Sequence, residues 1–103
     1  MLTWLFALAL AQDIPGEVEA QFIRARVAAQ PAAVREFIER RAMCNHFMGE
    51  EGYDRQRRRD LARAIRELRC LSIDRDEAAL LRSFAARADT VALLIETRDI
   101  LGW

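Results

Sequence analysis

Apolar side chains recur at intervals of three or four residues along most of this chain. That spacing puts them on one face of an α-helix, and no stretch alternates apolar and polar residues for long enough to form a convincing strand. Five such segments follow one another, near residues 14–29, 31–48, 54–71, 74–85 and 89–101. The sequence therefore predicts an all-α fold, a small bundle of four to five short antiparallel helices.

Three residues mark the boundaries of the first three helices. Pro31 ends the first helix and opens the second, because proline is tolerated in a first turn but not in a helix interior. Gly49 stands where a glycine commonly closes a helix, and Asp54 is a favourable N-cap for the third. We therefore expect a short turn between the second and third helices.

The last two helices carry boundary signals of the same kind. Asp74 followed by Glu77 is typical of a capping box at the start of the fourth helix. Asp89 or Thr90 is expected to cap the last helix, and Gly102 to end it.

The first eleven residues form a separate segment. Residues 1–11 contain no charged side chain, and charged residues follow soon after Gln12. An apolar run of this length is too short to cross a bilayer, but with the small-x-small pattern that ends at Ala11 it is typical of a signal peptide. We expect cleavage before Gln12, one helical domain over residues 12–103, and a periplasmic or secreted protein. A retained N-terminal core helix is the alternative.

Cys44 and Cys70 are the only cysteines. In an oxidising compartment we expect them to form one disulfide that staples the bundle and stabilises it by about 3 kcal/mol. Cys70 falls nearly opposite Leu61 and Leu68 if the third helix runs that far. The bridge therefore requires that the helix stops earlier or that another helix covers its second face. Two free thiols that bind a metal in the cytosol are the alternative.

The charges balance, because all 16 basic residues are Arg and 16 residues are acidic. A net charge of zero gives no global attraction to nucleic acid or to an anionic membrane, so a charged partner must be recognised locally. The absence of lysine excludes chemistry that needs an amine nucleophile. We expect no cofactor, no nucleic-acid partner and no membrane span after signal cleavage.

The densest group of functional side chains lies at residues 44–54, with the only His and the only Tyr of the chain. This stretch resembles short exported bacterial helical proteins with a C-N-H-F-x-G-E-E sequence, then Tyr-Asp, and a second Cys after an arginine-rich helix. The residues that carry the resemblance are Cys44, Asn45, His46, Phe47, Gly49, Glu50, Glu51, Tyr53, Asp54 and Cys70. The resemblance implies an exported helical domain and no particular activity.

One interpretation of this segment is a metal site. His46 and Glu50 are four residues apart, which would align them on one helical face, with Glu51 or Asp54 as further oxygen donors. Gly49 is expected to break the helix between them, which counts against this interpretation.

A second interpretation is a catalytic site. His46 would act as the base, Glu50 or Glu51 as the acid, and Tyr53 as a proton donor. Adjacent carboxylates seldom converge on one substrate bond, and the chain has no nucleophile elbow and no glycine-rich phosphate loop. We therefore do not expect an enzyme.

The third interpretation, which we favour, is a stapled turn between two helices. Asn45 and His46 would hydrogen-bond the end of one helix, and Asp54 would cap the next. The two glycines would adopt unusual backbone angles and the two aromatic rings would pack beside the disulfide: Gly49, Gly52, Phe47 and Tyr53. A rigidly held turn can also carry a binding surface.

Four arginines of the third helix lie opposite its apolar face, and we call them the arginine stripe: Arg55, Arg59, Arg63 and Arg66. Guanidinium groups bind carboxylates and phosphates in a fixed fork geometry, so an acidic protein surface or an envelope anion would fit. Neighbouring acidic residues could neutralise the stripe, in which case it is only a solvated face.

The last apolar segment, residues 91–101, has two interpretations as well. We expect its side chains in the core of the bundle. The alternative is a helix that binds in the groove of a partner.

Together these features predict a non-catalytic binding domain for a protein partner or an anionic envelope component. The residues expected to bind are Asn45, His46, Glu50, Glu51, Tyr53, Asp54, Arg55, Arg59, Arg63 and Arg66. A metal-binding protein centred on His46 and Glu50 is the alternative.

Overall fold

The computed structural model describes residues 15–102, and the all-α prediction is confirmed there: these residues form five α-helices and one 3₁₀ turn, with no strand. The elements are α2 (Pro15–Ala28), α3 (Ala32–Met48), α4 (Arg55–Glu67), the 3₁₀ turn η1 (Cys70–Ser72), α5 (Ile73–Ser83) and α6 (Ala88–Glu96). The predicted signal peptide, residues 1–11, lies outside the described residues. No helix among those described is both long and apolar enough to cross a membrane.

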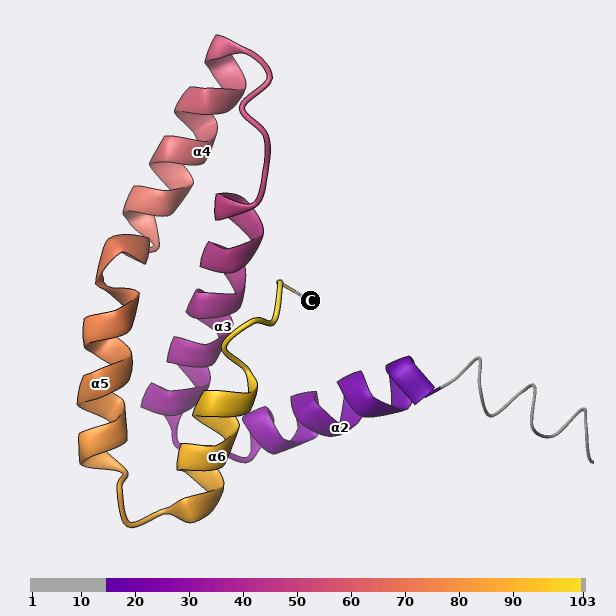
Figure 1. Cartoon of the computed structure of the whole chain (residues 1–103), viewed down its shortest axis with the longest axis vertical. Coiled ribbons are helices and arrows are strands. Elements are labelled where there is room, and N and C mark those ends of the chain that lie inside the picture. The colour runs from indigo at the N-terminus through magenta and orange to yellow at the C-terminus, as the bar shows by residue number, and fades with distance from the viewer. Residues whose placement is uncertain (1–14, 103) are drawn as a thin grey trace, which may run out of the picture.

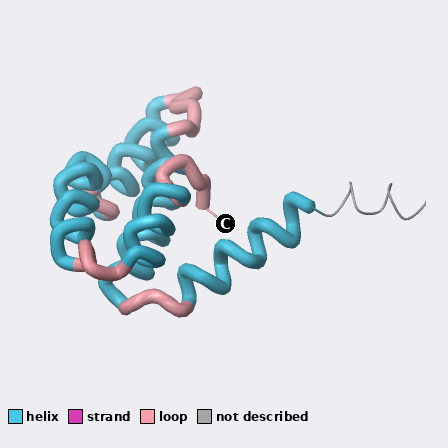
Figure 2. The backbone as a smooth tube through the Cα atoms, turned by 60° about the horizontal axis from the view of Figure 1, so that its bottom comes forward, coloured by secondary structure: helices cyan, strands magenta, loops and turns pink. Residues whose placement is uncertain are grey.

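α3 is the central helix and contacts α2, α4, α5 and α6. In Figure 1 the chain rises along α3, turns over, descends through α4 and α5, and rises again in α6. α2 leaves the base of this bundle and projects to one side (Figures 1 and 2). The shape is flat, 16 Å along its shortest axis, and its radius of gyration of 17.8 Å exceeds the roughly 12 Å of a compact domain of this length.

The core lies where α6 and the end of α2 pack against the first half of α3. Val34 and Ile38 of α3 meet Leu93 and Leu94 of α6, and all four are almost completely buried. Val27 of α2 closes the cluster. The last helix is therefore part of the core, as its apolar pattern predicted.

A buried arginine fastens α3 to α5 and α6. Arg41 is 3% exposed, and its Nη2 donates to the Leu94 carbonyl at 2.7 Å and to Thr97 Oγ1 at 2.8 Å. Its Nη1 donates to Glu77, whose carboxylate also accepts from Arg98. Burial lowers the pKa of Arg41 and the Glu77 charge opposes that shift, so the guanidinium stays charged.

The boundaries of the last two helices differ from the sequence prediction. α5 begins after Ser72 and has no capping box, because Glu77 binds the arginines of α3 and the C-terminal segment instead. α6 begins at Ala88, and neither Asp89 nor Thr90 caps it. Thr90 is buried and donates to Gln30 Oε1 at 2.6 Å, so tertiary hydrogen bonding replaces the expected local cap.

α6 also ends earlier than predicted. Its last residue is Glu96, with Thr97 at the C-cap position, and Gly102 lies beyond it in an irregular segment. The Thr97 hydroxyl donates to the Leu93 carbonyl at 2.7 Å and accepts from Arg41. The last turn of α6 is therefore bonded to the buried Arg41.

The end of α4 explains how the two cysteines meet. Leu68 is the C-cap residue, and Arg69 follows in the left-handed conformation, with φ 54° and ψ 48°. This reversal takes Cys70 off the face of α4 and places its Cα 5.6 Å from that of Cys44, to which it is disulfide-bonded. Of the two conditions set by the sequence, the early end of the third helix is the one fulfilled. Leu71, the residue after Cys70, is 93% exposed.

Candidate functional site

The turn between α3 and α4 begins without the expected glycine geometry. Gly49 has φ −89° and ψ −7°, and its N–H bonds to the Asn45 and His46 carbonyls as a helical residue would. No glycine in the described range has a positive φ, so the prediction of unusual angles at Gly49 and Gly52 is wrong. The backbone angles at Gly49 stay close to helical, so Glu50 remains on the same face as the residues of the last turn of α3.

His46 and Glu50 meet because of that continued path. His46 Nε2 lies 3.3 Å from Glu50 Oε1, and the other oxygen of Glu50 lies 3.5 Å from Arg57 Nη2. α3 nevertheless ends at Met48 with Gly49 as its C-cap, so the expected end of the helix at Gly49 is confirmed, and the turn that follows still leaves His46 and Glu50 close together. Yet no group of three or more His, Cys, Asp or Glu within residues 15–102 lies close enough together to hold a metal ion.

Asn45 and Asp54 have structural roles on either side of this turn. Asn45 Nδ2 donates to the carbonyls of Arg98 at 2.8 Å and Ile100 at 3.0 Å, so it binds the C-terminal segment rather than its own helix end. Asp54 Oδ1 accepts from the Arg57 N–H at 2.7 Å, and its N-cap role is confirmed.

The tip of the turn faces solvent. Tyr53 is 77% exposed and Glu51 is also exposed, so the prediction that Tyr53 packs beside the disulfide is wrong. Phe47 is partly buried, with its ring edge against the His46 imidazole at 5.2 Å between centroids. Arg58 Nη1 donates to the Gly52 carbonyl at 3.1 Å and holds the turn against α4.

The arginine stripe lies along the solvent face of α4, and all four members are exposed: Arg55, Arg59, Arg63 and Arg66. None of them makes an ion pair in the described part of the chain, and Arg59 Nη2 donates to the neutral amide oxygen of Gln56 at 3.2 Å. Of the nearby carboxylates, Asp54 caps the helix and Asp60 accepts from Gln56 at 2.9 Å, and neither makes an ion pair with the stripe in the described structure. The stripe therefore keeps its positive charge.

α4 carries the stripe out to the edge of the molecule. Its first turn reaches beyond the C-terminal end of α3 (Figure 1). Leu61 is its only fully buried residue in the described structure. The structure thus brings the exposed turn and the stripe onto one end of the bundle.

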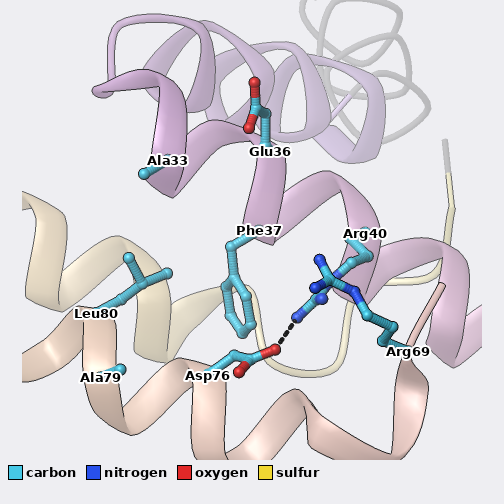
Figure 3. A pocket seen from close by; sticks show the side chains of 8 residues that line it. All are labelled: Ala33, Glu36, Phe37, Arg40, Arg69, Asp76, Ala79 and Leu80. Atoms are coloured by element: carbon cyan, nitrogen blue, oxygen red, sulfur yellow. Dashed lines mark hydrogen bonds and ion pairs between the residues drawn. The ribbon is translucent and has the colours of Figure 1, made fainter.

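Sequence analysis missed a cavity of about 370 Å³ between α3 and α5 (Figure 3). Three of its four charged side chains are Arg40, Arg69 and Asp76, and Arg40 Nη2 donates to Asp76 Oδ2 at 2.6 Å. That bond, with a smaller contribution from Ser72, holds the pKa of Asp76 below its usual value. The remaining lining residues are Ala33, Glu36, Phe37, Ala79 and Leu80. Arg69 stands directly before Cys70 in the sequence, and that position was a signal for the cavity. No pattern in the sequence indicates that α3 lies opposite α5.

A second depression, of about 620 Å³, lies where α4 meets η1. Its lining includes Arg66, Arg69 and the exposed Leu71. Arg69 therefore contributes to both hollows, whereas Arg66 lines only this one.

Comparison of the chain with protein-family models, with curated proteins and with solved structures finds no match.

Proposed function

We propose that this chain is a small exported, non-catalytic binding domain that recognises an acidic protein surface through the arginine stripe and the adjoining turn. The observation that carries the proposal is the lack of carboxylate partners for the stripe in the described structure. Arg26 pairs with Glu96 and Arg40 with Asp76. Arg35 and Arg82 are unpaired among the described residues but stand singly on different helices, so the stripe is set apart by four such arginines on one helix face. A row of exposed guanidinium groups without internal partners is suited to an external anion.

The form of α4 favours a protein partner over a lipid surface. A helix that binds a membrane needs an exposed apolar face to insert beside its basic residues. Leu61 of α4 packs inward, and the face that carries the stripe is polar. The stripe spans about 16 Å of helix, since each residue adds about 1.5 Å. That length fits several carboxylates on a folded partner, and an anionic envelope component is the competing outcome.

The turn supplies the rim of the proposed surface. Tyr53 and Glu51 are exposed at the tip, and the pair of His46 and Glu50 lies behind them. An exposed tyrosine gives a rigid contact at little entropic cost. Asn45, which we expected at the surface, is committed to the C-terminal segment and has a supporting role.

The disulfide supports the proposed periplasmic or secreted location. Cys44 and Cys70 are 1% and 6% exposed, and a buried structural bridge of this kind persists where thiols are oxidised.

A labelled glutamate-rich peptide tests this function by fluorescence anisotropy. The stripe variant Arg59→Gln/Arg63→Gln is expected to bind about tenfold more weakly, because each exposed ion pair contributes about 0.2–1 kcal/mol. The control Arg35→Gln/Arg82→Gln removes the same charge from α3 and α5, where these arginines make no ion pair in the described structure, and should bind as the wild type. Equal binding by both variants, or none by the wild type, would refute the proposal.

The metal-binding alternative rests on the pair of His46 and Glu50. Native mass spectrometry of the exported protein tests it directly. The binding-domain proposal expects no ion in the wild type or in His46→Ala, whereas a metal protein would lose its ion in that variant.

A further inference from the structure

The cavity between α3 and α5 is lined by two arginines, Arg40 and Arg69, and by two carboxylates, Glu36 and Asp76. Figure 3 shows Arg40 bonded to Asp76, with Arg69 beside Arg40 in this view and the carboxylate of Glu36 pointing away from both arginines. Asp76 already accepts from Arg40 at 2.6 Å and from Ser72 at 3.1 Å. Arg75 lies on its far side, 3.8 Å from the other carboxylate oxygen. Asp76 thus pairs with Arg40 and Arg75, whereas the guanidinium of Arg69 has no ion pair among residues 15–102 and is open to an anion.

Arg40 has a donor that the fold does not use. Its side chain is 15% exposed, and Nε is buried without a hydrogen-bond partner in the described structure. Arg41 Nε is buried without a hydrogen-bond partner there as well, and both guanidinium groups lie over the Phe37 ring. The guanidinium carbon of Arg40 lies 5.5 Å from the centroid of the Phe37 ring, which holds the group at the cavity floor.

Arg69 is kept in a strained backbone conformation. With φ 54° and ψ 48° it occupies a region that favours glycine, and it is the only described non-glycine residue with a positive φ. Its guanidinium has no ion pair or hydrogen bond among residues 15–102, although it lies at the cavity. The neighbouring Cys70 is fixed by the disulfide to α3. The disulfide and the hydrogen bonds of Ser72 to the Arg69 carbonyl hold this conformation in place.

The remaining walls are apolar. Ala33, Phe37, Ala79 and Leu80 surround the arginines, and the volume of about 370 Å³ is that of a site for a small molecule. The ligand must then combine one negative group for the guanidinium forks with a short apolar group for the walls. A carboxylate matches the planar fork of arginine with two parallel hydrogen bonds.

We propose that the cavity between α3 and α5 is a binding site for a small carboxylic acid with a short apolar chain, held by Arg40 and Arg69. Its apolar chain lies against Phe37 and Leu80. This site is separate from the surface proposed for the acidic protein partner, and each can exist without the other.

Hexanoate is the probe for this site, and the methyl NMR signals of Ala33, Ala79 and Leu80 report its binding. We expect those signals to shift on titration. Hexan-1-ol, which has the same chain without the charge, should bind at least about tenfold more weakly, since a hydrogen bond to a charged group contributes a factor of this size. Hexylamine should not bind. Inorganic phosphate tests for a general anion site, and binding as tight as that of hexanoate would overturn the proposal.

Arg69→Gly separates the function of the side chain from the stability of the fold. Glycine relieves the backbone strain, so this variant should unfold at a higher temperature than the wild type and yet lose hexanoate binding by at least about tenfold. The control Arg66→Gln removes the same charge from the neighbouring depression and should bind hexanoate as the wild type does. Unchanged binding in Arg69→Gly, or equal losses in both variants, would overturn the proposal.

Discussion

Arginine has opposite environments at the two ends of this molecule. Where α3, α5 and α6 meet, Arg41 is buried and paired with Glu77, and Arg98 shares the same carboxylate. On α4, Arg55 and Arg63 are exposed and make no ion pair in the described structure. The difference depends on which carboxylates lie within reach of the arginines at each end. Arginine therefore fastens helices at one end and is available to a partner at the other.

The disulfide connects these two ends. Leu61, which is 7% exposed, is the only buried residue of α4 in the described structure, and that is too little to hold a helix of this length by itself. Cys70 follows α4 directly and is bonded to Cys44 on the central helix. The bridge thus supplies the attachment that apolar packing does not, and it leaves the stripe side of α4 uncovered.

Replacing Arg41 gives the sharpest test of this contrast. Arg41→Met should destabilise the fold by about 3–5 kcal/mol, because it leaves the Glu77 carboxylate without its buried partner and two acceptors on α6 unsatisfied. Arg63→Met, on the stripe, should change the free energy of unfolding by less than about 0.5 kcal/mol. Urea unfolding of the two variants measures both. Similar losses would contradict the division into fastening and free arginines.

Removing the disulfide should act mainly on the α4 end. Cys44→Ser/Cys70→Ser is expected to lose about 3 kcal/mol of stability. Hydrogen exchange should then speed up most in α4, while the amides of Leu93 and Leu94 keep the strongest protection. Uniformly faster exchange in both regions would show that α4 is held by packing rather than by the bridge.

The features that the sequence predicted depend on neighbours in the chain. Pro31 at the start of α3 and Asp54 at the start of α4 act on backbone groups within three or four residues, and both predictions are confirmed. The disulfide was also predicted, because only two cysteines could pair. The all-α fold follows from the spacing of apolar residues, which needs no knowledge of tertiary contacts.

The features that the sequence did not predict depend on contacts between distant segments. Glu77 was assigned to a cap, but α3 brings Arg41 to it from 36 residues away. Thr90 was assigned to a cap, but Gln30 binds it across the core. Asp76 drew no attention until the fold placed it opposite Arg40. Local propensity cannot identify such partners, because it does not say which helix faces lie against each other.

A smaller effect is expected at the N-terminus of α4. Asp54→Ala removes the acceptor for the Arg57 N–H and should destabilise the protein by about 1 kcal/mol. Asp54→Asn keeps a good capping group and serves as the matched control. Circular dichroism during urea unfolding measures both. The stripe begins next to this cap. If Asp54→Ala lost as much stability as removal of the disulfide, α4 would have a larger role in stability than its burial indicates.

The smallest effect concerns the pH dependence of the Arg40 and Asp76 pair, which joins the fastening end to the cavity. The Arg40 hydrogen bond lowers the pKa of Asp76 in the folded protein below the usual 3.8. A carboxyl group with a lowered pKa stabilises the fold above the unfolded value, and that contribution disappears as the pH falls through the folded one. Asp76→Asn should therefore be less stable than the wild type at neutral pH. The difference in the free energy of unfolding between the two proteins should become smaller below about pH 3.8. The carboxylate is partly exposed, so solvent screens the pair and the gap stays modest.

Urea midpoints of Asp76→Asn and the wild type at neutral pH and at about pH 3 measure this change. Other carboxylates titrate in both proteins and cancel in the difference. Asp74→Asn, on the same helix, removes a carboxylate that makes no ion pair within the described residues and should have little effect at neutral pH. A gap that persists unchanged at low pH would mean that Asp76 stabilises the fold through its packing and not through its charge. Arg40 would then be a free cation like those of the stripe, and the contrast between the two ends of the molecule would be weaker than its ion pairs suggest.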